Sequence, residues 1–96
     1  MKSLSCKKII FTGHAVERMF KRGISKSEIC MCIENGDIIE EYPDDTPYPS
    51  LLLLGFVQER PIHIVLAIDN KNESCVIVTA YEPDIKLWGE NLKKGG

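Results

Sequence analysis

Hydrophobic residues recur at helical spacing in two short segments near the N-terminus, and the first lies between Thr12 and Gly23. Thr12 suits a helix N-cap, because its hydroxyl can accept from the free backbone N–H groups of the first turn. Gly23 suits the left-handed position just past a helix end. We expect four apolar residues to share the side that faces the core: Ala15, Val16, Met19 and Phe20. The segment therefore predicts a helix of two to three turns.

The second segment starts with a capping box, in which Ser25 caps the helix and Glu28 reaches back to the cap residue. Its apolar side carries Ile29, Cys32 and Ile33. Asn35 and Gly36 form a strong stop signal. The pattern predicts a second helix from Lys26 to about Glu34.

Beyond Gly36 the pattern changes to strand-length segments separated by turns. The predicted strands cover residues 37–42, 51–59, 62–69 and 74–81, and residues 8–11 form an edge strand or the start of the first helix. Gly55 predicts a bulge or a bend, and the three prolines within residues 43–50 predict an irregular loop. Short turns favour antiparallel pairing. We therefore predict an α+β domain, with two N-terminal helices packed on one face of a three- to four-stranded antiparallel sheet.

The 96 residues make one domain, with a predicted core from about residue 8 to residue 88 and a disordered tail over residues 89–96. Trp88 is expected to cover a sheet edge or a helix seam. No apolar run approaches the ~18–20 residues of a membrane span, and the start of the chain lacks the apolar core of a signal peptide. We therefore expect a cytoplasmic protein that makes no membrane contact. The sequence leaves its oligomeric state open.

The four cysteines are Cys6, Cys30, Cys32 and Cys75. Cys30 and Cys32 are spaced as C-x-C, but no second close pair completes a zinc site. Without a secretion signal, a disulfide framework is not expected. We interpret the cysteines as reduced, small hydrophobic residues, and a partial metal site with His14 or His63 is the alternative. The prediction is a chain with no bound metal and no cofactor.

The formal net charge of −2 does not indicate a nucleic-acid binder, but the charges are unevenly distributed. Up to Lys26 the chain has seven basic residues against Glu17 alone, so 7 − 1 = +6. The remainder has 5 basic and 13 acidic residues, so 5 − 13 = −8. Such asymmetry can concentrate positive potential on one face. The alternative is that the acidic half packs beside the basic half.

Three potential cations form a row on the first predicted helix. His14, Arg18 and Arg22 are each four residues apart, so they stack beside the apolar side. Such a row at the edge of a core indicates an anion nearby, which is either a carboxylate of this chain or a bound phosphate. Thr79 and Tyr81 share one face of the last predicted strand.

These residues match the needs of RNA cleavage by the RNA's own 2′-hydroxyl, which requires a base, an acid and positive charge on the phosphate. An imidazole such as His14 can move a proton near neutral pH, and Arg18 can hold phosphate oxygens through two parallel bonds. Tyr81 can donate a proton or stack on a base. We therefore take His14, Arg18 and Tyr81 as catalytic candidates. The candidates for binding RNA phosphate are Arg22, Lys21 and Thr79.

Each candidate has a structural alternative. His14 lies in the first turn of its helix and can instead bond a loop carbonyl. The two arginines can instead pair with acids, for which the candidates are Glu40, Glu41, Asp44 and Asp45. Tyr81 can simply fill a strand, and His63 reads as a core or edge histidine. The register between the last two strands decides whether His63 shares a face with Tyr81, and the sequence leaves that register open.

The chain resembles domain-of-unknown-function family 4258 over about residues 11–88. The matching motifs are His14-Ala15-x-x-Arg18-Met19-x-x-Arg22-Gly23-Ile24, Ser25-x-x-Glu28, Asn35-Gly36-Asp37-Ile38-Ile39 and Thr79-Ala80-Tyr81-x-Pro83. That family is regarded as related to RelE-type bacterial toxins, which cleave RNA. The resemblance implies a RelE/barnase-like ribonuclease toxin fold. It also points to the candidate residues of the helix and of the last strand.

Two functions follow as hypotheses. The first is a metal-independent endoribonuclease of a toxin–antitoxin module, with RNA as its substrate and an antitoxin protein as its partner. The second is a non-catalytic protein-interaction module on the same fold. The pI of about 5.6 departs from the basic character of typical RNA-cleaving toxins and favours the second.

Overall fold

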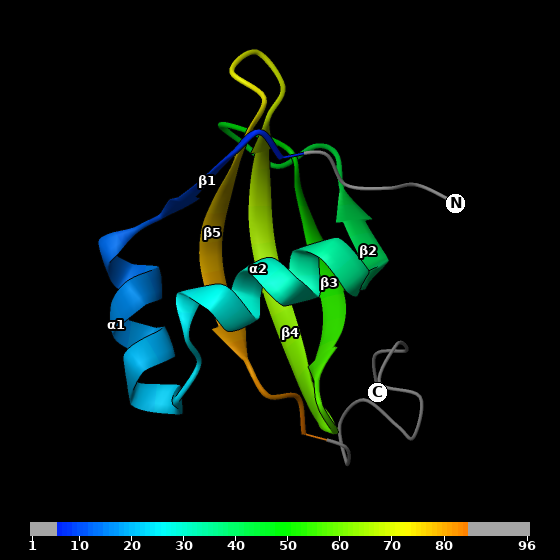
Figure 1. The fold of residues 1–96 in the computed structure, drawn as a ribbon. Helices are drawn as coiled ribbons and strands as arrows, with labels where there is room; N and C mark the ends of the chain where they lie inside the picture. The colour runs from blue at the N-terminus through cyan, green and yellow to red at the C-terminus, as the bar shows by residue number, and fades with distance from the viewer. Residues whose placement is uncertain (1–5, 85–96) are drawn as a thin grey trace.

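A computed structural model describes residues 6–84 of the chain. Two helices and five strands follow in the order β1 (Lys8–Phe11), α1 (Gly13–Arg22), α2 (Lys26–Asn35), β2 (Asp37–Tyr42), β3 (Ser50–Val57), β4 (Arg60–Asp69) and β5 (Ser74–Tyr81). The strands form one sheet, across which α2 lies, while α1 lies beside it (Figure 1). The predicted mixed α+β class with two N-terminal helices is confirmed. The predicted limit of the core at residue 88, the role of Trp88 and the disordered tail all lie outside the described residues.

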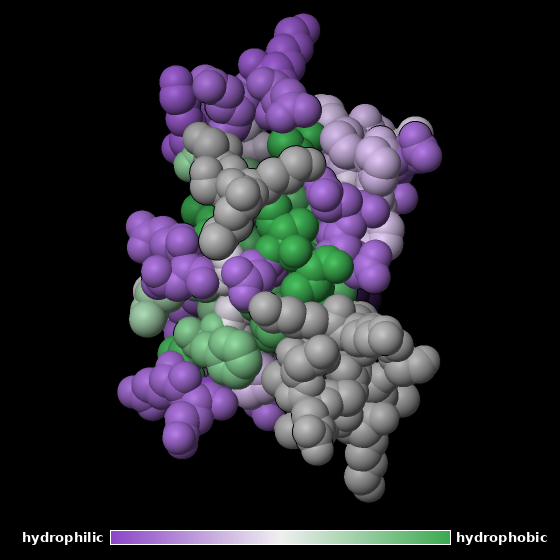
Figure 2. All heavy atoms as spheres, turned by 90° about the vertical axis from the view of Figure 1, so that its right-hand side faces the viewer, coloured by the Kyte–Doolittle hydropathy of each residue, from purple (hydrophilic) through white to green (hydrophobic). Residues whose placement is uncertain are grey.

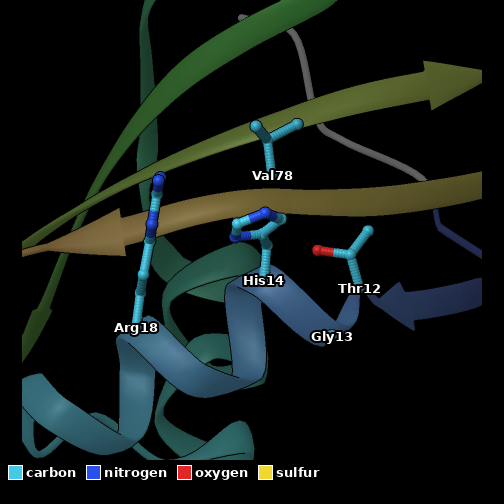
Figure 3. Close-up of a pocket in the computed structure, with 5 residues that line it drawn as sticks. All are labelled: Thr12, Gly13, His14, Arg18 and Val78. Atoms are coloured by element: carbon cyan, nitrogen blue, oxygen red, sulfur yellow. The ribbon is translucent and has the colours of Figure 1, made fainter.

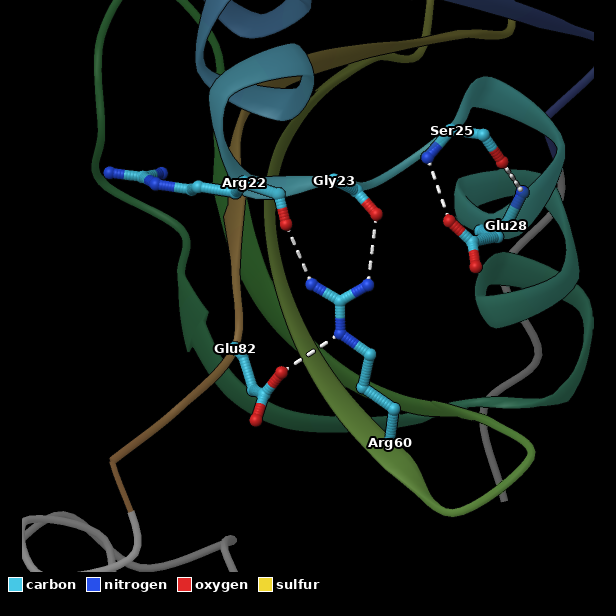
Figure 4. Close-up of polar contacts among 6 residues, drawn as sticks. All are labelled: Arg22, Gly23, Ser25, Glu28, Arg60 and Glu82. Atoms are coloured by element: carbon cyan, nitrogen blue, oxygen red, sulfur yellow. Dashed lines mark hydrogen bonds and ion pairs between the residues drawn. The ribbon is translucent and has the colours of Figure 1, made fainter.

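Both helices begin and end where the capping residues predict. The Thr12 hydroxyl accepts a hydrogen bond from the backbone N–H of Ala15, and Gly23 ends α1 in the left-handed conformation, with φ of 67°. The capping box of α2 is complete, because Ser25 Oγ accepts from Glu28 N at 3.1 Å and Glu28 Oε1 accepts from Ser25 N at 2.8 Å (Figure 4). These local bonds satisfy backbone donors that a helix start leaves unpaired.

The prediction that four apolar residues of α1 face the core is wrong for two of them. Ala15 and Met19 are buried, but Phe20 is 85% exposed and Val16 is 38% exposed. The reason is that α1 packs mainly against β5, at one side of the sheet. Only a narrow strip of the helix can be buried there, so Val16 and Phe20 are left facing solvent.

The sheet has the strand order β1-β5-β4-β3-β2, with antiparallel pairs throughout except for β1, which pairs parallel to β5. The prediction of three to four antiparallel strands is therefore wrong in strand number and, at one edge, in direction. Strand β1 has only 4 residues, and its partner lies far along the chain. A parallel pairing over such a separation leaves no turn signal in the sequence.

A β-bulge in β5 changes which residues of this strand share a face. Val65 pairs with Thr79 and Leu66 pairs with Ile77, so Val78 is the extra residue. Before the bulge Ile77 faces the core, and after it Ala80 does, with both fully buried. The bulge thereby moves Thr79 off the core face, together with Tyr81 two residues further on.

Helix α2 approaches β3 closely because Gly55 has no side chain. A Cβ at position 55 would lie 2.7 Å from Cys32 Sγ and 2.8 Å from Cys32 Cα. The pairing of Gly55 with Ile62 continues the regular register of β3 and β4, so a bulge between these strands at Gly55 is wrong. The glycine instead permits close packing of a helix on the sheet.

The prediction of four reduced cysteines is also wrong, because Cys6 and Cys75 form a disulfide with a Cα–Cα distance of 5.6 Å. The parallel β1–β5 pair brings these residues together although they are 69 positions apart. Cys30 and Cys32 are free thiols. Burial, with a smaller effect from Glu28, raises the pKa of the Cys32 thiol to about 11, so this thiol stays protonated at neutral pH.

The far edge of the sheet carries β2, and Figure 2 shows hydrophobic side chains between polar groups on that side of the molecule.

Among residues 6–84, no helix is long and apolar enough to cross a membrane. The location of the protein in the cytoplasm stays a prediction.

Candidate functional site

Helix α1 continues along the edge of β5 where β1 ends. Strand β1 pairs with residues 74–77 of β5. At the start of α1, Thr12 Oγ1 donates to the carbonyl of Ile77 at 3.2 Å. At its end, Arg22 Nη1 donates to the carbonyl of Ala80 at 2.9 Å and to Thr79 Oγ1 at 3.3 Å. The helix therefore runs beside the last residues of β5 from one end to the other.

The contact between α1 and the last residues of β5 is called the seam below. The row of His14, Arg18 and Arg22 lies along this seam. His14 and Arg18 rise from the same side of α1 toward β5, where Val78 stands opposite (Figure 3). A pocket of about 600 Å³ lies here, and it is lined by Thr12, Gly13, His14, Arg18 and Val78. Among residues 6–84, the side chains of His14 and Arg18 make no hydrogen bond or ion pair, and both residues are exposed. Their polar groups are therefore available to a ligand.

Arg22 is held by β5 rather than by an acidic side chain. Its two hydrogen bonds go to a hydroxyl and a carbonyl, both uncharged. Within the part of the chain that the structure describes, neither Arg18 nor Arg22 forms an ion pair with an acid. Among residues 6–84 the two arginines therefore do not form the ion pairs that the sequence offers as alternatives.

Tyr81 is half-buried at the end of the seam where β5 and α1 both finish. Its ring meets that of His63 edge-on, at 5.4 Å between centroids, because the two residues are cross-strand partners. The register thus places His63, which is fully buried, on the same face as Tyr81. Burial and the neighbouring Tyr42 raise the pKa of Tyr81, while Arg22 lowers it, with a net upward shift. Tyr81 therefore remains a proton donor at neutral pH.

Lys21 lies outside this arrangement. Its Nζ contacts Glu17 Oε1 at 3.3 Å, one helical turn away, and its side chain is 70% exposed. The pair is a solvent-facing i, i+4 contact of the kind that contributes little to stability. The predicted phosphate role of Lys21 would require this contact to be exchanged for one to RNA.

Sequence reasoning missed Arg60, which binds the C-terminal end of α1. Its Nη2 donates to Arg22 O at 2.7 Å, its Nη1 to Gly23 O at 2.9 Å, and its Nε to Glu82 Oε1 at 2.8 Å (Figure 4). The planar guanidinium thus binds the carbonyl end of the helix and a carboxylate at once. The Arg60-Pro61 dipeptide indicates only a turn, so no signal in the sequence marked this residue.

No group of three or more His, Cys, Asp or Glu side chains within residues 6–84 is arranged to hold a metal ion. The side chains along the seam offer an imidazole, guanidinium groups, a hydroxyl and a phenol. These groups can move protons and hold an anion.

The fold and the seam define a small α+β domain with a cationic helix face laid along the end of a sheet strand. Residues 11–82 match the family described as "Domain of unknown function (DUF4258)", and the chain belongs to this family. The matched region contains all of the candidate residues of the seam. A search of curated proteins and a search of solved structures each returned no match.

Proposed function

We propose that the chain is a metal-independent endoribonuclease of the toxin type, with RNA as its substrate and an antitoxin protein as its partner. The observation that carries this proposal is the pair of His14 and Arg18, whose side chains line a pocket and make no hydrogen bond or ion pair within the described chain. Arg22 spends hydrogen bonds on the fold, and residues with a purely structural role would be expected to do the same. His14 and Arg18 instead leave an imidazole and a guanidinium at the pocket.

The reaction we propose is attack of the RNA 2′-oxygen on the adjacent phosphorus. His14 accepts the 2′-hydroxyl proton as the new oxygen–phosphorus bond forms. Arg18 and Arg22 stabilise the negative charge that develops on the phosphate oxygens. Tyr81 donates a proton to the 5′-oxygen as its bond to phosphorus breaks. The products are a 2′,3′-cyclic phosphate and a 5′-hydroxyl.

We also propose the relationship to RelE-type toxins that the sequence motifs suggest. Support comes from the two helices on a mainly antiparallel sheet, and from the seam residues that lie within the family match. Positive charge supports RNA as the ligand, because residues 7–26 carry Lys7, Lys8, Arg18, Lys21, Arg22 and Lys26 against Glu17 alone. A cationic region of this kind attracts the phosphate backbone even when the net charge is negative.

A non-catalytic protein-interaction module is the second candidate function. One observation favours it, namely the exposed apolar pair on α1, in which Phe20 is 85% exposed and lies one turn from Val16. Exposed aromatic residues of this kind often anchor protein contacts. This pair lies on a different side of α1 from the row of cations, so the second function does not need the pocket.

The proposed reaction is tested by incubating the purified protein with a single-stranded RNA and with the same oligonucleotide carrying one 2′-deoxy residue. The expected result is cleavage of the RNA to a 2′,3′-cyclic phosphate and a 5′-hydroxyl, with no cleavage after the deoxy position. Products with 3′-hydroxyl ends, or cleavage of the deoxy linkage, would contradict the proposed chemistry. Intact RNA at every protein concentration would favour the interaction module.

A further inference from the structure

The pocket beside His14 is larger and less polar than a phosphate requires. Its volume of about 600 Å³ lies within the range of small-molecule sites. Arg18 brings a guanidinium to its lining. Gly13 contributes no side chain, Val78 contributes methyl groups, and Thr12 has its hydroxyl engaged with Ile77 O. A single anion would leave most of this surface uncovered.

The bulge in β5 aims Val78 at the pocket. Val78 is the unpaired residue between Ile77 and Thr79, and it is 43% exposed. In Figure 3 Val78 rises from β5 beyond the imidazole of His14, with its methyl groups directed away from α1, and Val78, His14 and Thr12 all line the pocket. Bulges next to functional sites commonly re-aim one side chain in this way. The pocket is therefore lined by both an apolar side chain and an aromatic ring.

We propose that this pocket holds a nucleobase of the RNA, next to the phosphate that Arg18 binds. A base is flat and aromatic, so it can stack on the His14 ring and pack against Val78. The proposed function supplies the ligand, which is RNA, and this inference rests on it. The new part is the position of the base. Successive members of the row are about 6 Å apart along the helix axis. The RNA backbone would therefore pass from the base in the pocket to Arg18 and then to Arg22.

Gly13 offers a way to fill the pocket without disturbing the fold. It is the first residue of α1, and a Cβ built there meets no atom within 4 Å. A Gly13→Leu side chain can thus occupy the pocket from its own wall, and Gly13→Ala serves as the matched control with a single added methyl group. The thermal midpoint of both variants should match or exceed that of the unchanged protein, because glycine disfavours a helix.

The experiment compares the binding of the four common nucleoside monophosphates with that of inorganic phosphate. We expect the unchanged protein to bind at least one nucleotide about tenfold or more tightly than phosphate, and Gly13→Leu to lose that advantage while its affinity for phosphate stays the same. Arg18→Ala should weaken both ligands. Equal affinity for nucleotide and phosphate, or a nucleotide advantage that survives Gly13→Leu, would overturn the base pocket.

Failure of the base pocket and failure of the ribonuclease proposal are separate results. If the protein cleaves RNA but binds nucleotides no better than phosphate, the base pocket is wrong and the ribonuclease proposal stands. If nucleotides bind in a manner sensitive to Gly13→Leu but RNA stays intact, the pocket stands and the reaction is wrong.

Discussion

Replacing His14 with alanine should slow RNA cleavage by about 10²- to 10⁴-fold, the range expected for loss of a positioned general base. The protein should remain as stable as before, because His14 is exposed and its side chain makes no hydrogen bond within residues 6–84. RNA affinity should fall far less than the cleavage rate, since Arg18 and Arg22 remain in place to hold the phosphate. The measurement is single-turnover cleavage of a labelled oligonucleotide, with a thermal melt of the same sample.

Phe20→Ala is the control for this experiment. Phe20 is on the same helix and is 85% exposed, but it lies outside the pocket lining. Its replacement should leave the cleavage rate unchanged, and it should weaken a protein partner if the exposed apolar pair is an interaction surface. A His14→Ala protein that cleaves RNA at the original rate would remove His14 from the reaction.

Loss of the Cys6–Cys75 disulfide should lower the free energy of unfolding by about 2–4 kcal/mol. The value belongs near the upper end of this range, because the bond joins residues 69 positions apart and restricts a long loop of the unfolded chain. Cys6→Ser is the variant to use, since Cys6 is only half-buried whereas Cys75 is 1% exposed. Denaturant unfolding of the two proteins gives the difference.

Cys30→Ser is the matched control for the disulfide, because Cys30 is a half-buried free thiol. Its stability should change little. A reducing agent should destabilise the unchanged protein and Cys30→Ser but have no further effect on Cys6→Ser. The finding of four reactive thiols in denatured, unreduced protein would contradict the bond and restore the prediction of reduced cysteines.

The local structure could be predicted because its signals lie within a few residues of one another. The Thr12 cap, the Gly23 end and the Ser25/Glu28 capping box each predict a helix boundary, and all are present. The polar turn after β4 likewise joins β4 and β5 at Asp69 and Ser74. In each case a short stretch of sequence contains both partners of the interaction.

Features that depend on distant pairing could not be predicted. The parallel β1–β5 contact and the disulfide both arise from the meeting of chain segments far apart in sequence. The bulge at Val78 depends on how two strands align, and a slip of one residue would exchange their faces. The exposure of Phe20 follows from the place of α1 at the side of the sheet, which helical periodicity does not specify.

In the candidate site too, local features could be predicted from the sequence and contacts between distant segments could not. Helical spacing was enough to place His14 and Arg18 on one side of α1, where they line the pocket. It could not show that Val78 would complete the pocket, or that Arg60 would hold the carbonyls of Arg22 and Gly23. These contacts join α1 to β5 and β4, and they exist only once the sheet has formed.

The central claim is that Arg18 serves RNA rather than the fold. The most direct test measures the salt dependence of RNA affinity and the thermal midpoint for the unchanged protein and for Arg18→Ala. Lys71→Ala, which removes one charge from the β4–β5 turn, controls for net charge, and Arg18→Lys keeps the charge without the planar fork. Arg18→Lys should retain binding better than cleavage.

For the unchanged protein we predict a log–log salt slope of about −1 to −2, since two arginines contact phosphate. Arg18→Ala should bind about 5- to 150-fold more weakly, with a flatter slope and an unchanged thermal midpoint. The opposite pattern, in which Arg18→Ala melts at a lower temperature and binds RNA as the unchanged protein does, would contradict the proposed role of this seam.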